Sequence, residues 1–190
     1  MKKAVLTVAT IATLVSNVLA DDNVLNKKAE IASIIGIGSF ENDASIFAAV
    51  SKLNSNDYGE MTIEASKDNI DINLYKPVKI FEDVVSVGFE SGYLKFKDYD
   101  PAGSVGLATT LNYFIDAPYL PKQQIGIYLK TGFDLAFGGV SRKEINSLYR
   151  TTLAAGCDRF VAGVSYKRIN LLNTNQDNRV NFFVGYSFTW

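Results

Sequence analysis

Seven charged side chains fall on one face of segments in which two kinds of residue alternate. They are Glu64, Glu90, Lys130, Asp134, Arg150, Arg159 and Lys167. Within these segments the charges share a face with Gly, Ala and Ser, whereas the opposite face carries aliphatic and aromatic residues. Strand side chains alternate between two faces, so these charges would share one interior. Three acids and four bases there could select ions as a ring of charge or neutralise one another as salt bridges. We expect salt bridges, because side chains nearly fill an interior of eight to ten strands.

The sequence has few of the residues that commonly serve in catalysis or metal binding. The chain has no histidine, which removes the usual general base and the commonest metal ligand. Its one cysteine, Cys157, cannot form an intramolecular disulfide, and no partner for a nucleophilic thiol is evident. The sequence therefore predicts a protein that is not an enzyme and has no catalytic residues, metal site or cofactor.

Composition and the N-terminus indicate where the protein resides. The 190 residues carry 19 Lys and Arg against 20 Asp and Glu, and this balance argues against a nucleic-acid partner. Residues 1–20 have the form of a cleaved secretory signal peptide, with Lys2 and Lys3 before the apolar run 4–15 and Val18-Leu19-Ala20 at its end. Residues 21–190 show no linker and are expected to form one domain.

Period-two alternation recurs along the mature chain and predicts β-strands. The strands are expected at 180–190, 159–170, 147–155, 124–137, 103–116 and 84–96, with weaker segments at 70–79, 59–67, 44–53 and 31–40. Many of these segments are longer than the strands of soluble proteins and are long enough to cross a bilayer at a tilt. We therefore predict an all-β, closed, antiparallel, up-and-down transmembrane β-barrel of about 10 strands, with 8 as the alternative if the weak segments merge or leave the barrel.

The last strand gives the clearest assignment of faces. Phe182, Val184, Tyr186 and Phe188 are expected to face lipid, whereas Asn181, Gly185 and Ser187 are expected to face the lumen. Because external loops are commonly the longer ones, 171–179, 138–146 and 97–102 are expected outside the cell, and 156–158, 117–123 and 80–83 on the periplasmic side.

The signal peptide, the alternating strands and the closing Phe188-Thr189-Trp190 resemble small outer-membrane β-barrel proteins of Gram-negative bacteria, with an OmpA/OmpX-like architecture. The stretch Val164 to Trp190 also resembles the YfaZ-like family. The barrel resemblance implies that Tyr186, Phe188 and Trp190 form a C-terminal assembly signal for the barrel-assembly machinery. It also implies residence in the bacterial cell outer membrane, with lipid and lipopolysaccharide as partners.

Three functions fit these observations. The first is a non-enzymatic barrel with an envelope-structural or surface-interaction role, which is consistent with the absence of the histidine on which enzymes of this architecture depend. The second is a small pore for ions or minor solutes. The third is a soluble lipocalin-like binding barrel, which would place apolar residues inside and charged residues outside. The Gly, Ser, Lys and Asp on the face opposite the aromatics argue against it.

Overall fold

The computed structural model describes residues 31–40, 43–52, 59–81, 84–116, 124–138, 144–157, 159–172 and 176–189. The predicted signal peptide at residues 1–20 and the final Trp190 lie outside these ranges. Within them, no helix is long and apolar enough to cross a membrane.

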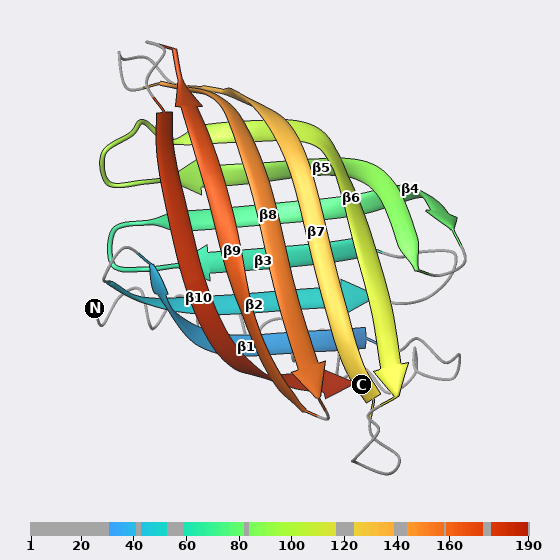
Figure 1. The fold of residues 1–190 in the computed structure, drawn as a ribbon. Helices are drawn as coiled ribbons and strands as arrows, with labels where there is room; N and C mark the ends of the chain where they lie inside the picture. The colour runs from blue at the N-terminus through green and yellow to red at the C-terminus, as the bar shows by residue number, and fades with distance from the viewer. Residues whose placement is uncertain are drawn as a thin grey trace, which may run out of the picture.

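Ten strands make up the described fold (Figure 1). They are β1 (Ile31–Phe40), β2 (Asp43–Lys52), β3 (Gly59–Ala65), β4 (Ile70–Phe81), β5 (Val85–Lys95), β6 (Ala102–Asp116), β7 (Gln124–Phe137), β8 (Ile145–Cys157), β9 (Phe160–Leu171) and β10 (Gln176–Thr189). This confirms the predicted count of ten, including the four weaker N-terminal segments.

The strands form one closed antiparallel barrel. Each strand pairs with its neighbours in sequence, and β1 pairs with β10 to close the sheet. Figure 1 shows the colours running in order around the barrel, with β6 to β10 crossing in front of β1 to β5. The predicted closed up-and-down topology is therefore confirmed, and the closed sheet has no free edge strand.

Two irregularities interrupt the pairing. In β4 the register shifts between Pro77 and Lys79, where proline has no N–H to give to the ladder. In β8 the register shifts between Ile145 and Ser147, and both Ser147 and Leu148 are then buried in the interior. The chain leaves β7 through Gly138, whose φ of 105° is a conformation that favours glycine.

The two faces of the barrel differ as the alternation predicts. On β10, Phe182 and Val184 are 64% and 58% exposed, whereas Asn181 is fully buried. Tyr186 and Gly185 are partly buried, and the side chains of Ser187 and Phe188 lie outside the description. The outward face of the other strands is also largely aliphatic and aromatic, with Ile37, Phe89, Leu107, Leu135 and Phe160 among its most exposed side chains.

Loop length does not distinguish the two ends of this barrel. The end with the expected external loops carries the connections 41–42, 66–69, 96–101, 138–144 and 172–175. The opposite end carries 53–58, 82–84, 117–123 and 158–159. The longest connections, 138–144 and 117–123, span the same number of residues, so the predicted orientation remains a prediction.

The interior contains two apolar clusters with polar residues between them. The first cluster is formed by Leu94, Phe96, Ile145, Leu148 and Ile169 at the end where β5 meets β6. The second is formed by Phe47, Ala49, Ala154, Val161 and Phe183, and Tyr128 packs against it. Along β7, β8 and β9, the interior charges therefore lie between residues of the two apolar clusters.

Candidate functional site

Eight ionisable side chains are joined by ion pairs inside the barrel, and we refer to them as the interior charge network. They are Glu60, Glu64, Asp71, Glu90, Lys130, Asp134, Arg150 and Lys167. They come from β3, β4, β5, β7, β8 and β9, and none has a side chain more than 11% exposed. Ions with so little contact with water are stable only when neighbouring groups compensate their charge.

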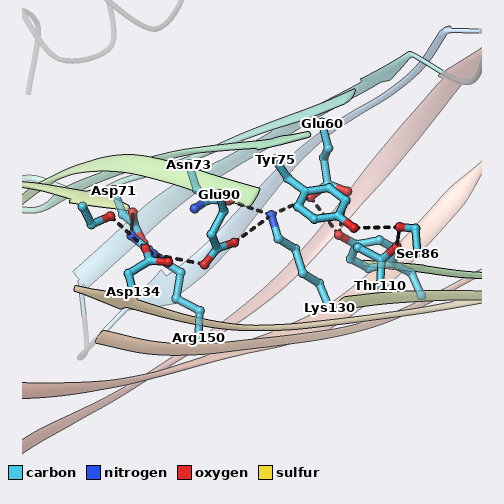
Figure 2. A network of polar contacts seen from close by, with 12 residues as sticks. Glu60, Asp71, Asn73, Tyr75, Ser86, Glu90, Thr110, Lys130, Asp134 and Arg150 are labelled. Atoms are coloured by element: carbon cyan, nitrogen blue, oxygen red, sulfur yellow. Dashed lines mark hydrogen bonds and ion pairs between the residues drawn. The ribbon is translucent and has the colours of Figure 1, made fainter. Parts of the chain in front are cut away.

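Arg150 on β8 is the most highly connected cation of the network (Figure 2). Its Nη1 donates to Asp134 Oδ2 and lies 3.5 Å from Glu90 Oε1. Its Nη2 lies 3.2 Å from Asp71 Oδ1. One planar guanidinium thus contacts three carboxylates from three different strands, an arrangement that suits its forked donors.

Lys130 on β7 contacts two further acids. Its Nζ lies 3.3 Å from Glu60 Oε1 and 3.5 Å from Glu90 Oε2, and donates to Asn73 Oδ1 at 2.6 Å. The same ammonium lies 5.0 Å from the centre of the Tyr75 ring. Figure 2 shows the two side chains next to each other. Glu90 therefore connects Lys130 to Arg150.

Lys167 on β9 extends the network to β3. Its Nζ lies 2.5 Å from Glu64 Oε2 and 3.0 Å from Asp71 Oδ2. Asn181 on β10 donates to the same Glu64 oxygen at 3.1 Å and accepts a hydrogen bond from Ser45 on β2. The result is a continuous set of polar contacts across the barrel from one wall to the other.

Glycines in the wall make room for these side chains. A Cβ on Gly132 would collide with the Glu90 carboxylate, and a Cβ on Gly106 would collide with the Asp134 carboxylate. Both glycines face the interior. The small residues of the inward face are thus part of the site, because they give the charged groups space to meet.

Hydroxyl groups complete the polar layer. Tyr128 donates to both oxygens of Glu60 at 2.6 and 2.7 Å. Tyr75 and Ser86 are hydrogen-bonded at 2.8 Å, and Ser86 and Thr110 at 2.6 Å (Figure 2). These bonds satisfy hydroxyls that would otherwise be buried at a cost of about 1–3 kcal/mol each.

Hydrogen bonds and cation–π contacts join the loop 96–101 to β10 at one end of the barrel. The Arg179 guanidinium lies 4.5 Å from the Phe96 ring centre and 5.3 Å from that of Tyr99. Asp177 Oδ2 accepts hydrogen bonds from Arg179 Nε and the Tyr99 hydroxyl, each at 2.8 Å. Burial, together with the hydrogen bond that the phenol donates to the negatively charged Asp177, raises the pKa of Tyr99 above 10.0.

Two hollows of different size are lined in part by residues of the network. A void lined by Glu64, Asp71 and Lys167 has a volume of about 10 Å³, close to the minimum for one water. A much larger hollow of about 820 Å³ is lined mainly by outward-facing side chains, including Met61, Leu74, Phe89 and Leu107. The large hollow is thus associated with the outer face of the sheet.

Six of the seven charges predicted for the lumen lie in the network: Glu64, Glu90, Lys130, Asp134, Arg150 and Lys167. Arg159 does not. It is exposed in the turn before β9, where its Nη1 donates to the Tyr186 hydroxyl at 2.9 Å. Its position in a turn explains the difference, because the alternation of a strand does not extend through a turn.

Two network acids, Glu60 and Asp71, were not in the predicted set. A signal for Asp71 is present in the sequence, since Asp71, Asn73 and Tyr75 alternate with Ile70, Ile72 and Leu74. The polar members of this series are buried and the apolar ones are more exposed. Glu60 is the second residue of the weaker segment β3, so only Gly59 precedes it to establish a face.

The residues predicted to form an assembly signal are described only in part. Tyr186 packs edge-on against Phe160 with ring centres 5.8 Å apart. The backbone of Phe188 pairs with Ser33 of β1, whereas its side chain and all of Trp190 lie outside the described residues. Their role as a signal remains a prediction.

The site offers charge pairing and hydrogen bonding rather than an evident reaction centre. Among the described residues, no group of three or more His, Cys, Asp or Glu side chains could hold a metal ion. The strong contacts join network members to one another, which favours a role in filling and fixing the interior.

Comparison with known proteins does not assign a family. No protein-family description matches the chain, and no curated protein matches its sequence. Among solved structures, the outer membrane channel DcaP of Acinetobacter baumannii is 11% identical, with a TM-score of 0.33. The match covers 80% of this chain and 54% of that one, so the chain spans about half the length of DcaP.

A second structure comes from work on the in-meso crystallization of membrane proteins. It is 8% identical, with 84% of each chain covered and a TM-score of 0.34.

Proposed function

We propose that the protein is an integral β-barrel of the bacterial outer membrane, that it is not an enzyme, and that it has an envelope-structural or surface-interaction role. The observation that carries this proposal is the distribution of side chains between the two faces. Phe182, Phe89 and Leu107 are each more than half exposed, while no ionisable side chain of the network is more than 11% exposed. This distribution is stable when lipid surrounds the barrel.

The outer hollow also supports contact with lipid. Its mainly apolar lining on β2 to β6 would be a costly surface in water, whereas acyl chains can fill it. A lipocalin-like barrel would show the reverse arrangement, with an apolar interior for its ligand and a charged exterior. Outer-membrane lipid and lipopolysaccharide are therefore the proposed surroundings, and the barrel-assembly machinery is the proposed partner during insertion.

The interior supports a closed barrel rather than a pore. Ion pairs cross the lumen from β3 to β9, and apolar clusters lie on both sides of them. A hydrated ion would have to separate buried pairs to pass. We therefore place the function in the barrel's surfaces and in its contribution to the membrane, rather than in transport.

Fractionation and electrical recording test this proposal. Full-length protein expressed in a Gram-negative host should sediment with the outer membrane, and unboiled samples should migrate differently from boiled ones on a detergent gel. The purified barrel should give little current in a planar bilayer. Recovery in the soluble periplasmic fraction would contradict the membrane assignment. A steady ion-selective current would favour the small pore.

A further inference from the structure

The interior charge network has more acids than bases. Its five carboxylates, from Glu60, Glu64, Asp71, Glu90 and Asp134, face three cations, from Lys130, Arg150 and Lys167. The formal sum is three minus five, or −2. The nearby pair of Arg179 and Asp177 is neutral and does not change this balance. Uncompensated charge with so little contact with solvent is strongly unfavourable.

The excess charge concentrates at Glu90 and Asp134. These two residues flank one glycine, because Gly106 on β6 pairs with Glu90 on β5 and with Asp134 on β7. All three face the interior, and both carboxylates contact the same atom, Arg150 Nη1. Two carboxylates thus depend on a single guanidinium nitrogen, and Gly106 has no side chain to separate them.

Each of these carboxylates also has an oxygen without a hydrogen bond. Glu90 Oε2 and Asp134 Oδ1 are buried and have no hydrogen-bond partner, while Glu90 Oε2 has only the Lys130 ammonium at 3.5 Å. The two side chains are 0% exposed. Buried polar atoms without a hydrogen bond are rare in folded proteins. Their presence here indicates that a further hydrogen-bonding partner, such as a proton, a water or an ion, belongs at this position.

Other charged and polar groups facing the pair already have partners. Arg150 also contacts Asp71, and Lys130 also contacts Glu60 and Asn73. Beyond Asp71 lies Lys167, which pairs with Glu64, and Tyr75 lies beneath Lys130. From β6, the Ser104 hydroxyl donates to Asp134 Oδ2 at 2.8 Å. Within the described part of the chain, the neighbouring side chains therefore supply no third cation for the pair.

We propose that Glu90 and Asp134 form a proton-binding site, in which one proton is shared between the two carboxyl groups at neutral pH. A protonated carboxyl can donate to its ionised neighbour, and adjacent carboxylates commonly share a proton in this way. The proton removes one of the two excess negative charges and provides a donor to a pair of carboxyl groups that each have an unsatisfied oxygen. A metal ion fits less well, since no group of three suitable ligands occurs among the described residues.

This proposal rests on the closed interior argued above, because water entering the lumen would stabilise both ionised carboxylates. Infrared spectroscopy of the purified full-length barrel tests it. The wild type at neutral pH should show the C=O stretch of a protonated carboxylic acid, which lies apart from the carboxylate bands. Glu90→Gln and Asp134→Asn should each abolish this band, since either carboxylate alone can ionise against Arg150.

Glu64→Gln is the matched control and should keep the band, because Glu64 pairs with Lys167 on the other side of the network. No band in the wild type would overturn the proposal, as would a band that survives in both variants at the pair. One equivalent of bound divalent cation, found by elemental analysis together with an absent band, would assign the compensation to a metal instead.

A measurement on the wild type alone keeps the proposal testable if a variant fails to fold. The band should disappear when the pH is raised while the unboiled barrel keeps its gel mobility, and a band unchanged until the barrel unfolds would count against a titrating pair. Failure of the two proposals can be told apart. A barrel that gives no current but lacks the band overturns the shared proton alone, whereas a steady ion-selective current overturns the closed interior on which the shared proton rests.

Discussion

Arg150 is the residue on which the interior depends most, because three carboxylates share its guanidinium. Replacing it with methionine would leave these carboxylates without their main cation while keeping much of the side-chain volume. We expect Arg150→Met to lower the free energy of unfolding by about 3–5 kcal/mol, the range found when one partner of a buried pair is removed. Urea unfolding in detergent micelles would measure the change.

A second variant separates pairing from packing. Adding Asp134→Leu to Arg150→Met should recover part of the loss, because the double variant removes an acid as well as the cation. Arg168→Met is the control, since Arg168 is an exposed arginine on the adjacent strand. Equal losses at Arg150 and Arg168, or simple additivity with Asp134, would contradict the network's role in stability.

Tyr99 provides a pH-dependent prediction in the loop at the barrel end. Its phenol is neutral in the folded loop and its folded pKa is raised, so its contribution to stability is complete below the unfolded value of about 10. That contribution is lost as the pH rises through the higher folded value. The difference in tyrosinate absorbance between wild type and Tyr99→Phe should therefore titrate above pH 10. A midpoint at or below 10 would contradict the contact with Asp177.

The sequence predicts the inward or outward position of some charged residues correctly and of others not. It places Lys130, Asp134 and Arg150 on the inward face because each lies within a long strand whose alternation is unbroken. It fails at Arg159, which follows the end of β8 by two residues, and at Glu60, near the start of a short strand. The strand pattern also does not predict which charged residues form ion pairs. Lys130 and Asp134 share a face of β7, but each pairs with a residue on another strand.

At the scale of the element, strands are much easier to predict than their ends. The expected strand 124–137 is the same as β7, because alternation continues to Gly138, where a positive φ ends it. β10 begins four residues before the predicted 180, within a polar stretch that shows no apolar alternation. Backbone pairing with β9 includes this stretch, and only the partner strand reveals it.

Gly163 on β9 tests how tightly the strands' inward faces pack. A Cβ at this position would meet the ring of Phe183 at close range, and Phe183 is itself stacked on Phe47 with ring centres 4.0 Å apart. We expect Gly163→Ala to destabilise the barrel by about 1–3 kcal/mol through overpacking. Thermal or urea unfolding should show this loss.

Gly59→Ala is the comparison, because a Cβ on Gly59 would meet only one backbone oxygen at an ordinary distance of 3.6 Å. Its effect should be small. If the two alanine variants unfold alike, the Phe183 ring must be free to move away, and the second apolar cluster would not be close-packed as described.

At the scale of the whole molecule, the membrane assignment predicts a large cost for charge on the outer face. Val184 is 58% exposed near the middle of the outward row of β10. Val184→Arg should lower stability in lipid vesicles by about 2–4 kcal/mol, the cost of arginine at the bilayer midplane. Reversible urea unfolding of protein inserted in vesicles gives the measurement.

Two controls make this result specific to lipid. Val184→Thr keeps the shape of the side chain and should cost much less, and Leu172→Arg places the same charge in an exposed turn between β9 and β10. Equal stability of Val184→Arg and Leu172→Arg would indicate that water, rather than lipid, surrounds the barrel.

The contacts between β2 and β10 across β1 affect the order in which the barrel can fold. Ser45 donates to Asn181 at 3.0 Å across 136 residues of chain, and Phe47 stacks on Phe183 beside it. Between them, β1 presents Gly36 and Gly38 to the interior. The nine hairpin pairings need only local loops, whereas closure at β1 and β10 joins distant segments and bears the largest entropic cost.

Until that seam closes, an open sheet would expose the interior charges to whatever medium surrounds it. A sheet of these strands is therefore not suited to a bilayer until β1 pairs with β10.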